Sequence, residues 1–368
     1  MKKIILVHPA GIGDAFEDLI LIKSILNYND IELHYVGNHF LKELLSLVKI
    51  KKLTTTIIDK RNLYSVKNIK SILKIPKHAD MVYIMPGMNL KKAAMLKYLL
   101  KPKYFLGGLL AYPPKNNKNI LPKVGYYDYV DNGNSKNHRL ISKKRFLSNF
   151  IEIDQLDFNI FDYSNLKIQE DTEGYIISKQ YIIIHIGSSH QFPIRSLSIN
   201  QWVKLIDNIL TELSYELVFI GNDYEKIIID QIINLCKIKN ITERVKNLAG
   251  NTSLKQMLFL IKGAHIVIST DSGPGQIAGL MKKKQVMFFG PTSHKVSYPL
   301  NNNCIIIYRE DECSPCYGTY MYDNCPNNNK CMDKIGIMPI MYALNKLDDF
   351  TFKNEFHSFN FIERINYD

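Results

Sequence analysis

The sequence Ser269-Thr270-Asp271-Ser272-Gly273-Pro274-Gly275-Gln276-Ile277-Ala278-Gly279 carries the clearest structural signal in this 368-residue chain. An apolar run at 264–268 precedes it, and a second run at 285–289 follows and ends in Gly290-Pro291-Thr292. This order predicts strand, Gly-rich turn, short helix, strand and a second turn. In a parallel α/β sheet both turns lie at the carboxyl ends of strands, where ligands bind. We therefore predict that Asp271, Ser272 and Gly273 contact a polyhydroxylated ligand; the alternative is that Asp271 is only a helix N-cap.

Strand-like and helix-like segments alternate on both sides of a stretch without periodicity at 157–178. Before it, strands are expected at 4–7, 31–36, 53–58, 81–85 and 105–106; after it, at 181–186, 216–220, 245–248, 264–268 and 285–289. Helical apolar spacing fills most of the intervals, which is typical of doubly wound, mostly parallel sheets. We expect domains at 1–165 and 176–340, then a helix and tail at 341–368 that could pack back on the N-terminal domain. Residues 113–135, rich in Pro, Asn, Lys and Tyr, are expected to form a long polar loop.

The composition is that of a soluble globular protein, with 46% apolar residues. No apolar stretch reaches the roughly 18 to 20 residues that a membrane span needs. The first residues turn polar too early for a signal peptide. We therefore expect a cytoplasmic protein, and a peripheral position on the inner face of the inner membrane is compatible with this.

The net charge of +12 is concentrated in the N-terminal part. Residues 1–150 hold 26 Lys and Arg against 10 Asp and Glu, whereas residues 151–368 hold 21 against 25. An anionic partner for the first part is the natural inference: a phosphorylated glycolipid, a membrane surface or nucleic acid. No recognition-helix, zinc-finger or RNA-binding signature supports nucleic acid. The alternative is a solvated basic face without a partner.

Three further strand–Gly turns carry polar groups. Gly11 and Gly13 precede Asp14, whose carboxylate suits general-base chemistry on a hydroxyl, or else a helix cap. In the second half, the pair Ser188-Ser189 and the guanidinium of Arg195 suit a diphosphate. A further turn is expected to hold ribose hydroxyls through Gly221 and Glu225. Together with the Asp271 turn, these three turns in this order are typical of a nucleotide-sugar site.

Four of the six cysteines lie within 19 residues: Cys313, Cys316, Cys325 and Cys331. A reducing cytoplasm argues against structural disulfides, and four thiolates could hold one structural zinc or iron ion. The alternative is a set of buried thiols in an irregular loop. Cys236 and Cys304 lie in apolar contexts and are expected in the core.

The sequence resembles the bacterial heptosyltransferases of glycosyltransferase family 9 over most of its length. The resemblance rests on these segments: Gly11-Ile12-Gly13-Asp14, His185-Ile186-Gly187-Ser188-Ser189, 195–205, Asn247-Leu248-Ala249-Gly250, Asp271-Ser272-Gly273-Pro274, Phe289-Gly290-Pro291-Thr292 and Cys331-Met332-Asp333-Lys334-Ile335. It implies a GT-B fold, in which two Rossmann-like domains face a central cleft. The N-terminal domain would take the acceptor, with Gly11 and Gly13 beside it, and the C-terminal domain the nucleotide-sugar.

The resemblance also implies an activity. The family's usual donor is ADP-heptose, its usual acceptor is the lipopolysaccharide inner core, and it inverts the anomeric centre without a catalytic metal. Asp14 would be the general base and Asp271 would hold the sugar hydroxyls. The chain departs from the family pattern at three positions: Arg195 replaces a usual Lys, Leu197 a usual Trp and Gln276 a usual His in the donor motif.

The sequence therefore predicts an inverting glycosyltransferase that moves heptose from ADP-heptose to a glycolipid of the lipopolysaccharide-core type. Within the same chemistry, a protein, O-antigen or capsule acceptor and another nucleotide-sugar are alternatives. An alternative of another class is a non-catalytic nucleotide-binding protein on the same fold, supported only by Leu197 and Gln276.

Overall fold

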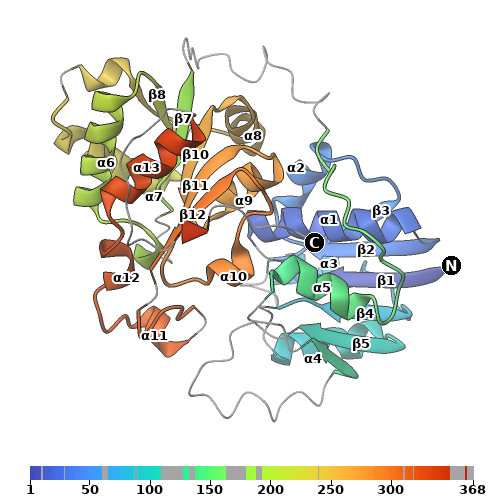
Figure 1. The fold of residues 1–368 in the computed structure, drawn as a ribbon. Helices are drawn as coiled ribbons and strands as arrows, with labels where there is room; N and C mark the ends of the chain where they lie inside the picture. The colour runs from blue at the N-terminus through green and yellow to red at the C-terminus, as the bar shows by residue number, and fades with distance from the viewer. Residues whose placement is uncertain are drawn as a thin grey trace. The chain divides into compact units, whose positions relative to one another are not determined.

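A computed structural model describes residues 1–9, 11–28, 30–59, 65–86, 88, 90–108, 127–131, 137–162, 180–187, 193–238, 240–309, 311–317, 319–348 and 361–362. The chain divides into two compact units, Met1–Asn165 and Leu166–Asp368 (Figure 1). Each unit is a mostly parallel sheet covered by helices, as expected from the alternating pattern. None of the described helices has the length and apolarity needed to cross a bilayer.

The first unit holds a six-stranded parallel sheet in the order β3-β2-β1-β4-β5-β6. Its strands are β1 (Lys2–Val7), β2 (Ile31–Gly37), β3 (Leu53–Ile57), β4 (Met81–Ile84), β5 (Tyr104–Gly108) and β6 (Tyr129–Asp131). Its helices are α1 (Ile12–Tyr28), α2 (Leu41–Ser46), α3 (Val66–Ile72), α4 (Leu90–Leu100) and α5 (Arg139–Leu147). Because β1 pairs with both β2 and β4, the strand order reverses there. The turn after β1 thus lies at a topological switch point, where doubly wound folds bind ligands.

The second unit holds a seven-stranded sheet in the order β13-β12-β11-β10-β7-β8-β9. Its strands are β7 (Tyr181–His185), β8 (Glu216–Phe219), β9 (Val245–Asn247), β10 (Ile266–Thr270), β11 (Lys284–Phe289), β12 (Cys304–Tyr308) and β13 (Phe361–Ile362). All of these pair in parallel except β13, which runs antiparallel to β12. Here the strand order reverses between β7 and β10, so the turns after these two strands share one switch point.

The helices of the second unit fall into long and short classes. The long ones are α6 (Ile199–Glu212), α7 (Asp223–Leu235), α8 (Leu254–Gly263), α9 (Gly273–Leu280) and α13 (Ile337–Leu347). The short ones are α10 (His294–Ser297), α11 (Tyr320–Asp323) and α12 (Lys330–Asp333), with 3-10 turns at Pro193–Arg195 and Ile241–Glu243. Trp202 of α6 is buried in the core and lies against Phe288 of β11.

Several boundaries differ from those expected. Strand β6 lies within the expected loop at 113–135, because its backbone extends the edge of β5 although its short sequence has no apolar period. Helix α13 runs across the expected boundary at residue 340 and packs on α6, β11 and β12, so it belongs to the second unit. Residues 349–360 and 363–368 lie outside the described residues, so packing of the tail on the N-terminal domain stays a prediction. As expected, Cys304 is buried; Cys236 is only partly buried.

Candidate functional site

Asp14 lies just beyond the carboxyl end of β1. The chain leaves β1 at Val7 and enters α1 at Ile12, so Asp14 is the third residue of that helix. Gly11 directly precedes the helix. Because Asp14 lies inside the first turn, it is not the N-cap that the sequence left as an alternative. Its side chain keeps 31% of its surface exposed, which suits contact with a substrate hydroxyl.

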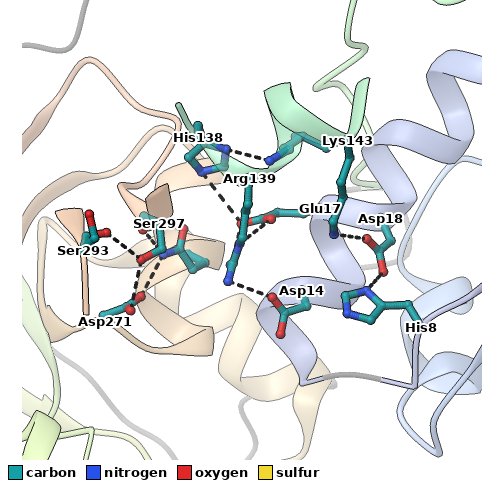
Figure 2. Close-up of polar contacts among 12 residues, drawn as sticks. His8, Asp14, Glu17, Asp18, His138, Arg139, Lys143, Asp271, Ser293 and Ser297 are labelled. Atoms are coloured by element: carbon teal, nitrogen blue, oxygen red, sulfur yellow. Dashed lines mark hydrogen bonds and ion pairs between the residues drawn. The ribbon is translucent and has the colours of Figure 1, made fainter. Parts of the chain in front are cut away.

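Arg139, the first residue of α5, binds two carboxylates of α1 at once (Figure 2). Its Nε and Nη2 atoms donate to the two carboxylate oxygens of Glu17, both at 2.7 Å. Its Nη1 atom lies 2.8 Å from Oδ1 of Asp14. A guanidinium that is fixed on one carboxylate by a bidentate pair has little freedom to leave the other. Asp14 is therefore held in one orientation.

A second cluster surrounds Asp18, one turn further along α1 (Figure 2). Lys143 Nζ lies 2.7 Å from its Oδ1, and His8 Nδ1 lies 2.5 Å from its Oδ2. The Tyr35 hydroxyl donates to the same Oδ2 at 2.9 Å. The side chain of Asp18 is fully buried and that of Lys143 is 5% exposed. The cluster therefore ties β1, β2, α1 and α5 together through a buried, fully partnered charge.

These contacts move the pKa values of the three carboxyls of α1 in different directions. Burial alone would raise the pKa of Asp14, but Arg139 and the other nearby cations hold it below its ordinary value. Burial prevails at Glu17 and raises its pKa. At Asp18 burial is outweighed by the two basic partners, so that its pKa is lowered. Asp14 is thus ionised at neutral pH, as a general base must be.

Sequence reasoning missed the partners of Asp14. The carboxylates Asp14, Glu17 and Asp18 are spaced to share one face of α1, and Arg139 and Lys143 share one face of α5. These complementary faces were the available signal. What the sequence lacked was the knowledge that α1 and α5 are neighbours, which the fold supplies.

In the second unit, Asp271 directly follows β10 and is 9% exposed. Its Oδ1 accepts a hydrogen bond from Gln276 Nε2 at 3.2 Å. Its Oδ2 accepts one from the Ser297 hydroxyl at 3.1 Å, which Figure 2 shows. The N-cap of α9 is Ser272, whose side chain accepts from the backbone N–H of Gly275. Asp271 is therefore not the cap. Its carboxylate is oriented by two donors at the switch point of the sheet.

Glycine is required at position 187 for the ends of β7 and β10 to approach each other. Gly187 has a φ of +67°, and a Cβ placed there would lie 1.6 Å from the Thr270 side-chain oxygen. Only glycine accepts both the conformation and the contact. Ser188 and Ser189 lie outside the described residues, so their contact with a diphosphate stays a prediction.

Arg195 is held at the Asp271 turn by the segment that contains the cysteines. Its Nε donates to the Tyr322 hydroxyl at 2.7 Å, and its Nη1 donates to the Asp271 carbonyl at 3.4 Å. Its guanidinium carbon lies 4.6 Å from the ring centre of Tyr317 and 5.6 Å from that of Tyr322. Burial would lower its pKa, but Asp271 and the two tyrosines raise it. The sequence predicted Arg195 but gave no sign of its aromatic partners.

Gly221 and Glu225 lie at the same edge of the sheet but have structural partners. Asn222 and Glu225 form a reciprocal capping box at the start of α7, and Glu225 is 2% exposed. Its Oε1 also lies 3.3 Å from His185 Nε2. A Cβ at Gly221 would lie 2.8 Å from Glu225 Oε2, so glycine leaves room for the cap. Contact of Glu225 with a ribose stays a prediction.

The cysteine segment lies against the turn that follows β11. Cys316 donates its backbone N–H to the Pro291 carbonyl at 2.9 Å, and a Cβ at Gly290 would lie 3.0 Å from Cys331 Sγ. All four thiols line one small cavity, together with Ile194, Pro291, Asp311, Asn327, Asn329 and Lys330. All six cysteines of the chain are free thiols.

Donors point at two of these sulfurs, as they do around metal-bound thiolates. Asn327 Nδ2 donates to Cys313 Sγ at 3.3 Å, and the Asn329 backbone N–H donates to Cys325 Sγ at 3.2 Å. Burial and the neighbouring thiols raise the pKa of Cys316 to about 11 and that of Cys331 to about 12. Within the described residues, no group of three or more His, Cys, Asp or Glu side chains is arranged to hold a metal ion. The four thiols are gathered without forming a coordination shell.

A sequence model described as glycosyltransferase family 9 (heptosyltransferase) matches residues 136–324, just over half of the chain. The chain belongs to this family. Lipooligosaccharide heptosyltransferase 2 of Campylobacter jejuni is 31% identical over 133 residues, which span 36% of this chain and only 40% of that protein. Lipopolysaccharide heptosyltransferase 1 of Campylobacter coli is 24% identical over 83% of this chain and 89% of its own length.

A solved structure of the same class shows the fold. The ADP-heptose lipopolysaccharide heptosyltransferase II of E. coli superposes with a TM-score of 0.66 at 17% identity, over 94% of this chain and 98% of that chain. The GT-B fold expected from the resemblance is therefore confirmed. The family match also covers the residues from Arg139 to Tyr322, which include the partners that the sequence alone did not reveal.

Proposed function

We propose that this protein is an inverting glycosyltransferase that transfers heptose from ADP-heptose to a hydroxyl of a lipopolysaccharide-core glycolipid. Membership of glycosyltransferase family 9 supports sugar transfer, and the names of the relatives favour heptose and lipopolysaccharide. The observation that carries the proposal is the pairing of Arg195 with the Asp271 turn at the switch point of the second sheet. The Nη1 atom of Arg195 lies 3.4 Å from the backbone carbonyl of Asp271, so a diphosphate bound by Arg195 and a sugar hydroxyl bound by the Asp271 carboxylate would share one turn.

The donor chemistry follows from these two groups. The Arg195 guanidinium is partly buried, charged and oriented by Tyr317 and Tyr322, so it can bind the diphosphate without a large ordering cost. The Asp271 carboxylate can accept hydrogen bonds from sugar hydroxyls. We propose that Arg195, rather than a metal ion, offsets the charge that grows on the diphosphate in the transition state.

In the proposed reaction the acceptor hydroxyl gives its proton to the Asp14 carboxylate. The acceptor oxygen forms a bond to the anomeric carbon as the bond from that carbon to the diphosphate oxygen breaks. The bonding pair leaves with the nucleotide diphosphate, next to Arg195. Attack from the face opposite the leaving group inverts the anomeric centre. The ion pair with Arg139 keeps Asp14 ionised and oriented before the proton moves.

The two departures in the donor motif do not favour a non-catalytic protein. Gln276 donates to Asp271 through Nε2 and also donates to the Ser297 carbonyl at 2.5 Å, so it still orients the carboxylate. Leu197 is 4% exposed and packs in the core cluster with Trp202. We infer that Gln276 tunes the site for its sugar, that Leu197 only fills the core, and that both leave transfer intact.

For the acceptor we propose an anionic glycolipid at the surface of the inner membrane. The basic balance of residues 1–150 supports it, because core glycolipids carry phosphate and carboxylate groups. A protein acceptor or a capsule or O-antigen intermediate is the competing choice. It would be identified by transfer to that acceptor and none to heptose-free core glycolipid.

For the cysteine segment we propose one structural zinc or iron ion, bound by Cys313, Cys316, Cys325 and Cys331. The shared cavity and the N–H donors to sulfur support it. Binding requires the thiols to lose their protons and to rearrange, because the described residues do not present three or more of these side chains as a ready metal site. The segment also carries Tyr317 and Tyr322, so an ordered metal site would stabilise the position of Arg195.

A panel of nucleotide-sugars tests the donor assignment. ADP-heptose, ADP-glucose, UDP-glucose and GDP-mannose are each added to the purified protein, and the midpoint of thermal unfolding is recorded. Binding to the native state stabilises it by mass action, so we expect the largest rise with ADP-heptose. A larger rise with a uridine or guanosine donor would replace the proposed donor, and no rise with any of the four would contradict a nucleotide-sugar site. A rise with ADP-heptose without its turnover would favour the non-catalytic alternative.

A further inference from the structure

Helix α3 of the first unit presents apolar side chains to solvent. Val66, Ile69 and Leu73 are 70%, 45% and 56% exposed. Their spacing of three and four residues places them along one face of the helix. Large apolar side chains are normally exposed singly on a protein surface, and a contiguous set indicates a binding surface.

A row of lysines lies beside this apolar face. Lys67, Lys70 and Lys74 are exposed and follow the same spacing, one residue further along, and Lys77 is exposed just after the helix. The sequence contains no Asp or Glu between Asp59 and Asp80. The two rows form one basic and apolar surface, called here the α3 surface.

The opposite face of the helix anchors it to the unit. Ile72 and Ile75 are 3% and 2% exposed and pack in the core of the first unit. The buried Asn68 side chain donates to the Asp59 carbonyl and accepts from the Asp59 N–H, both at 3.0 Å. Because these contacts fix the rotation of the helix, the α3 surface faces away from the sheet and its exposure is not a result of fraying.

We propose that the α3 surface docks on an anionic lipid bilayer. Lysines beside an apolar row fit a bilayer, in which apolar side chains enter the acyl boundary while ammonium groups contact anionic head groups. A soluble polyanion would leave Val66, Ile69 and Leu73 in water. A second copy of the chain would bring lysine rows of the same sign together. The inference rests on the proposed function only in placing the acceptor in a membrane.

Flotation with lipid vesicles tests the proposal. The full chain is mixed with vesicles of phosphatidylcholine containing one quarter phosphatidylglycerol, or of phosphatidylcholine alone. We expect flotation with the anionic vesicles, much less with the neutral ones, and release as salt is raised from about 50 to about 500 mM, because screening of the lysine charges becomes stronger over this range. Absence of binding to anionic vesicles at low salt would overturn the proposal.

Two variants separate charge from apolar contact. Replacement of Lys70 and Lys74 by Glu should lower vesicle partition by at least about fivefold per lysine. The triple change Val66→Ser, Ile69→Ser and Leu73→Ser should lower it by a similar or larger factor at constant charge. If the serine variant binds like the wild type, the surface recognises anions only and the bilayer assignment is wrong.

The second unit offers a matched control. Ile227, Leu235 and Met338 are 70%, 50% and 45% exposed, so their replacement by Ser removes a comparable apolar surface elsewhere. This variant should float like the wild type, and equal loss in both triple variants would contradict docking through α3. Calorimetry with ADP separates this proposal from the proposed function. If an α3 variant no longer floats but still binds ADP, only the α3 surface is affected. If the wild type floats but does not bind ADP, the proposed function is contradicted and the docking proposal is not.

Discussion

At the residue scale, Asp14 carries the proposed chemistry. Asp14→Asn keeps the size of the side chain but removes its basicity. We expect transfer to fall by about 10²- to 10⁴-fold, the usual contribution of a general base. Calorimetry should give the wild-type affinity for ADP, since Arg195 and Asp271 are unchanged. Transfer at the wild-type rate would show that Asp14 is not the base.

Arg195 provides the second test of single residues. Arg195→Ala should weaken ADP binding by about 10- to 150-fold, which corresponds to the roughly 1.5–3 kcal/mol of a hydrogen bond to a charged group. Tyr322→Phe keeps the ring and removes only the hydroxyl that accepts from Arg195, so a smaller loss in the same direction is expected. Titration calorimetry with ADP measures both. Unchanged affinity in the alanine variant rules out a diphosphate role.

The sequence predicted residues whose local pattern is informative. Asp271 and Arg195 were predicted because a strand followed by a Gly-rich turn places the next polar residues at a sheet edge, and the structure shows that the two residues are in contact. Arg139 and Tyr322 were missed because their roles depend on contacts across 122 and 127 residues of sequence. Periodicity gives the face that a side chain occupies but not its partner on a distant element.

At the scale of elements, the buried pair of Lys143 with Asp18 joins α5 to α1. Lys143→Met leaves the carboxylate buried without its cation, and we expect a loss of about 3–5 kcal/mol in the free energy of unfolding. Arg145→Met, at an exposed position on the same helix, serves as a control and should change it by less than about 0.5 kcal/mol. Urea unfolding of both variants measures this, and equal stabilities would show that the pair contributes nothing.

The pH dependence of that difference has a definite sign. The folded pKa of Asp18 is lowered, so its pairing stabilises the protein fully above its unfolded pKa, about 3.9, and this stabilisation is lost as the pH falls through the lower folded value. The gap between the wild type and Lys143→Met should therefore be constant from about pH 5 to 8 and shrink below about pH 4. A gap that instead widens in acid would contradict the assignment.

The cysteine segment gives the second prediction for an element. If Cys316 is a metal ligand, Cys316→Ser or a chelator should lower the unfolding midpoint before catalysis is affected, since a closed four-thiolate shell is structural. Cys236→Ser, outside the cluster, is the matched control and should have little effect. Elemental analysis of the purified protein should find about one zinc or iron per chain. A stable, metal-free protein with four titratable thiols at the cluster would remove the site.

For the whole molecule, the alternation of segments was sufficient to predict two doubly wound units. Strands such as β4 and β7 are buried apolar runs bounded by turn residues, a pattern that can be read from the sequence without knowledge of the tertiary structure. The exceptions were local. Strand β6 is too short to show a period. The expected domain boundary at residue 340 fell inside α13, because the sequence shows the helical spacing of this segment but not the sheet on which it packs.

The central claim is that Asp14 acts as the acceptor base and that Arg195 and Asp271 bind the donor. Release of ADP that depends on the acceptor tests both roles at once. The purified protein is incubated with ADP-heptose, with and without heptose-free lipopolysaccharide core. The released ADP is quantified, and the mass of the glycolipid is measured by mass spectrometry. We predict ADP release that depends on the acceptor, together with a gain of one heptose on the glycolipid. Binding of ADP-heptose without ADP release or mass gain on any of the proposed acceptors would contradict the account.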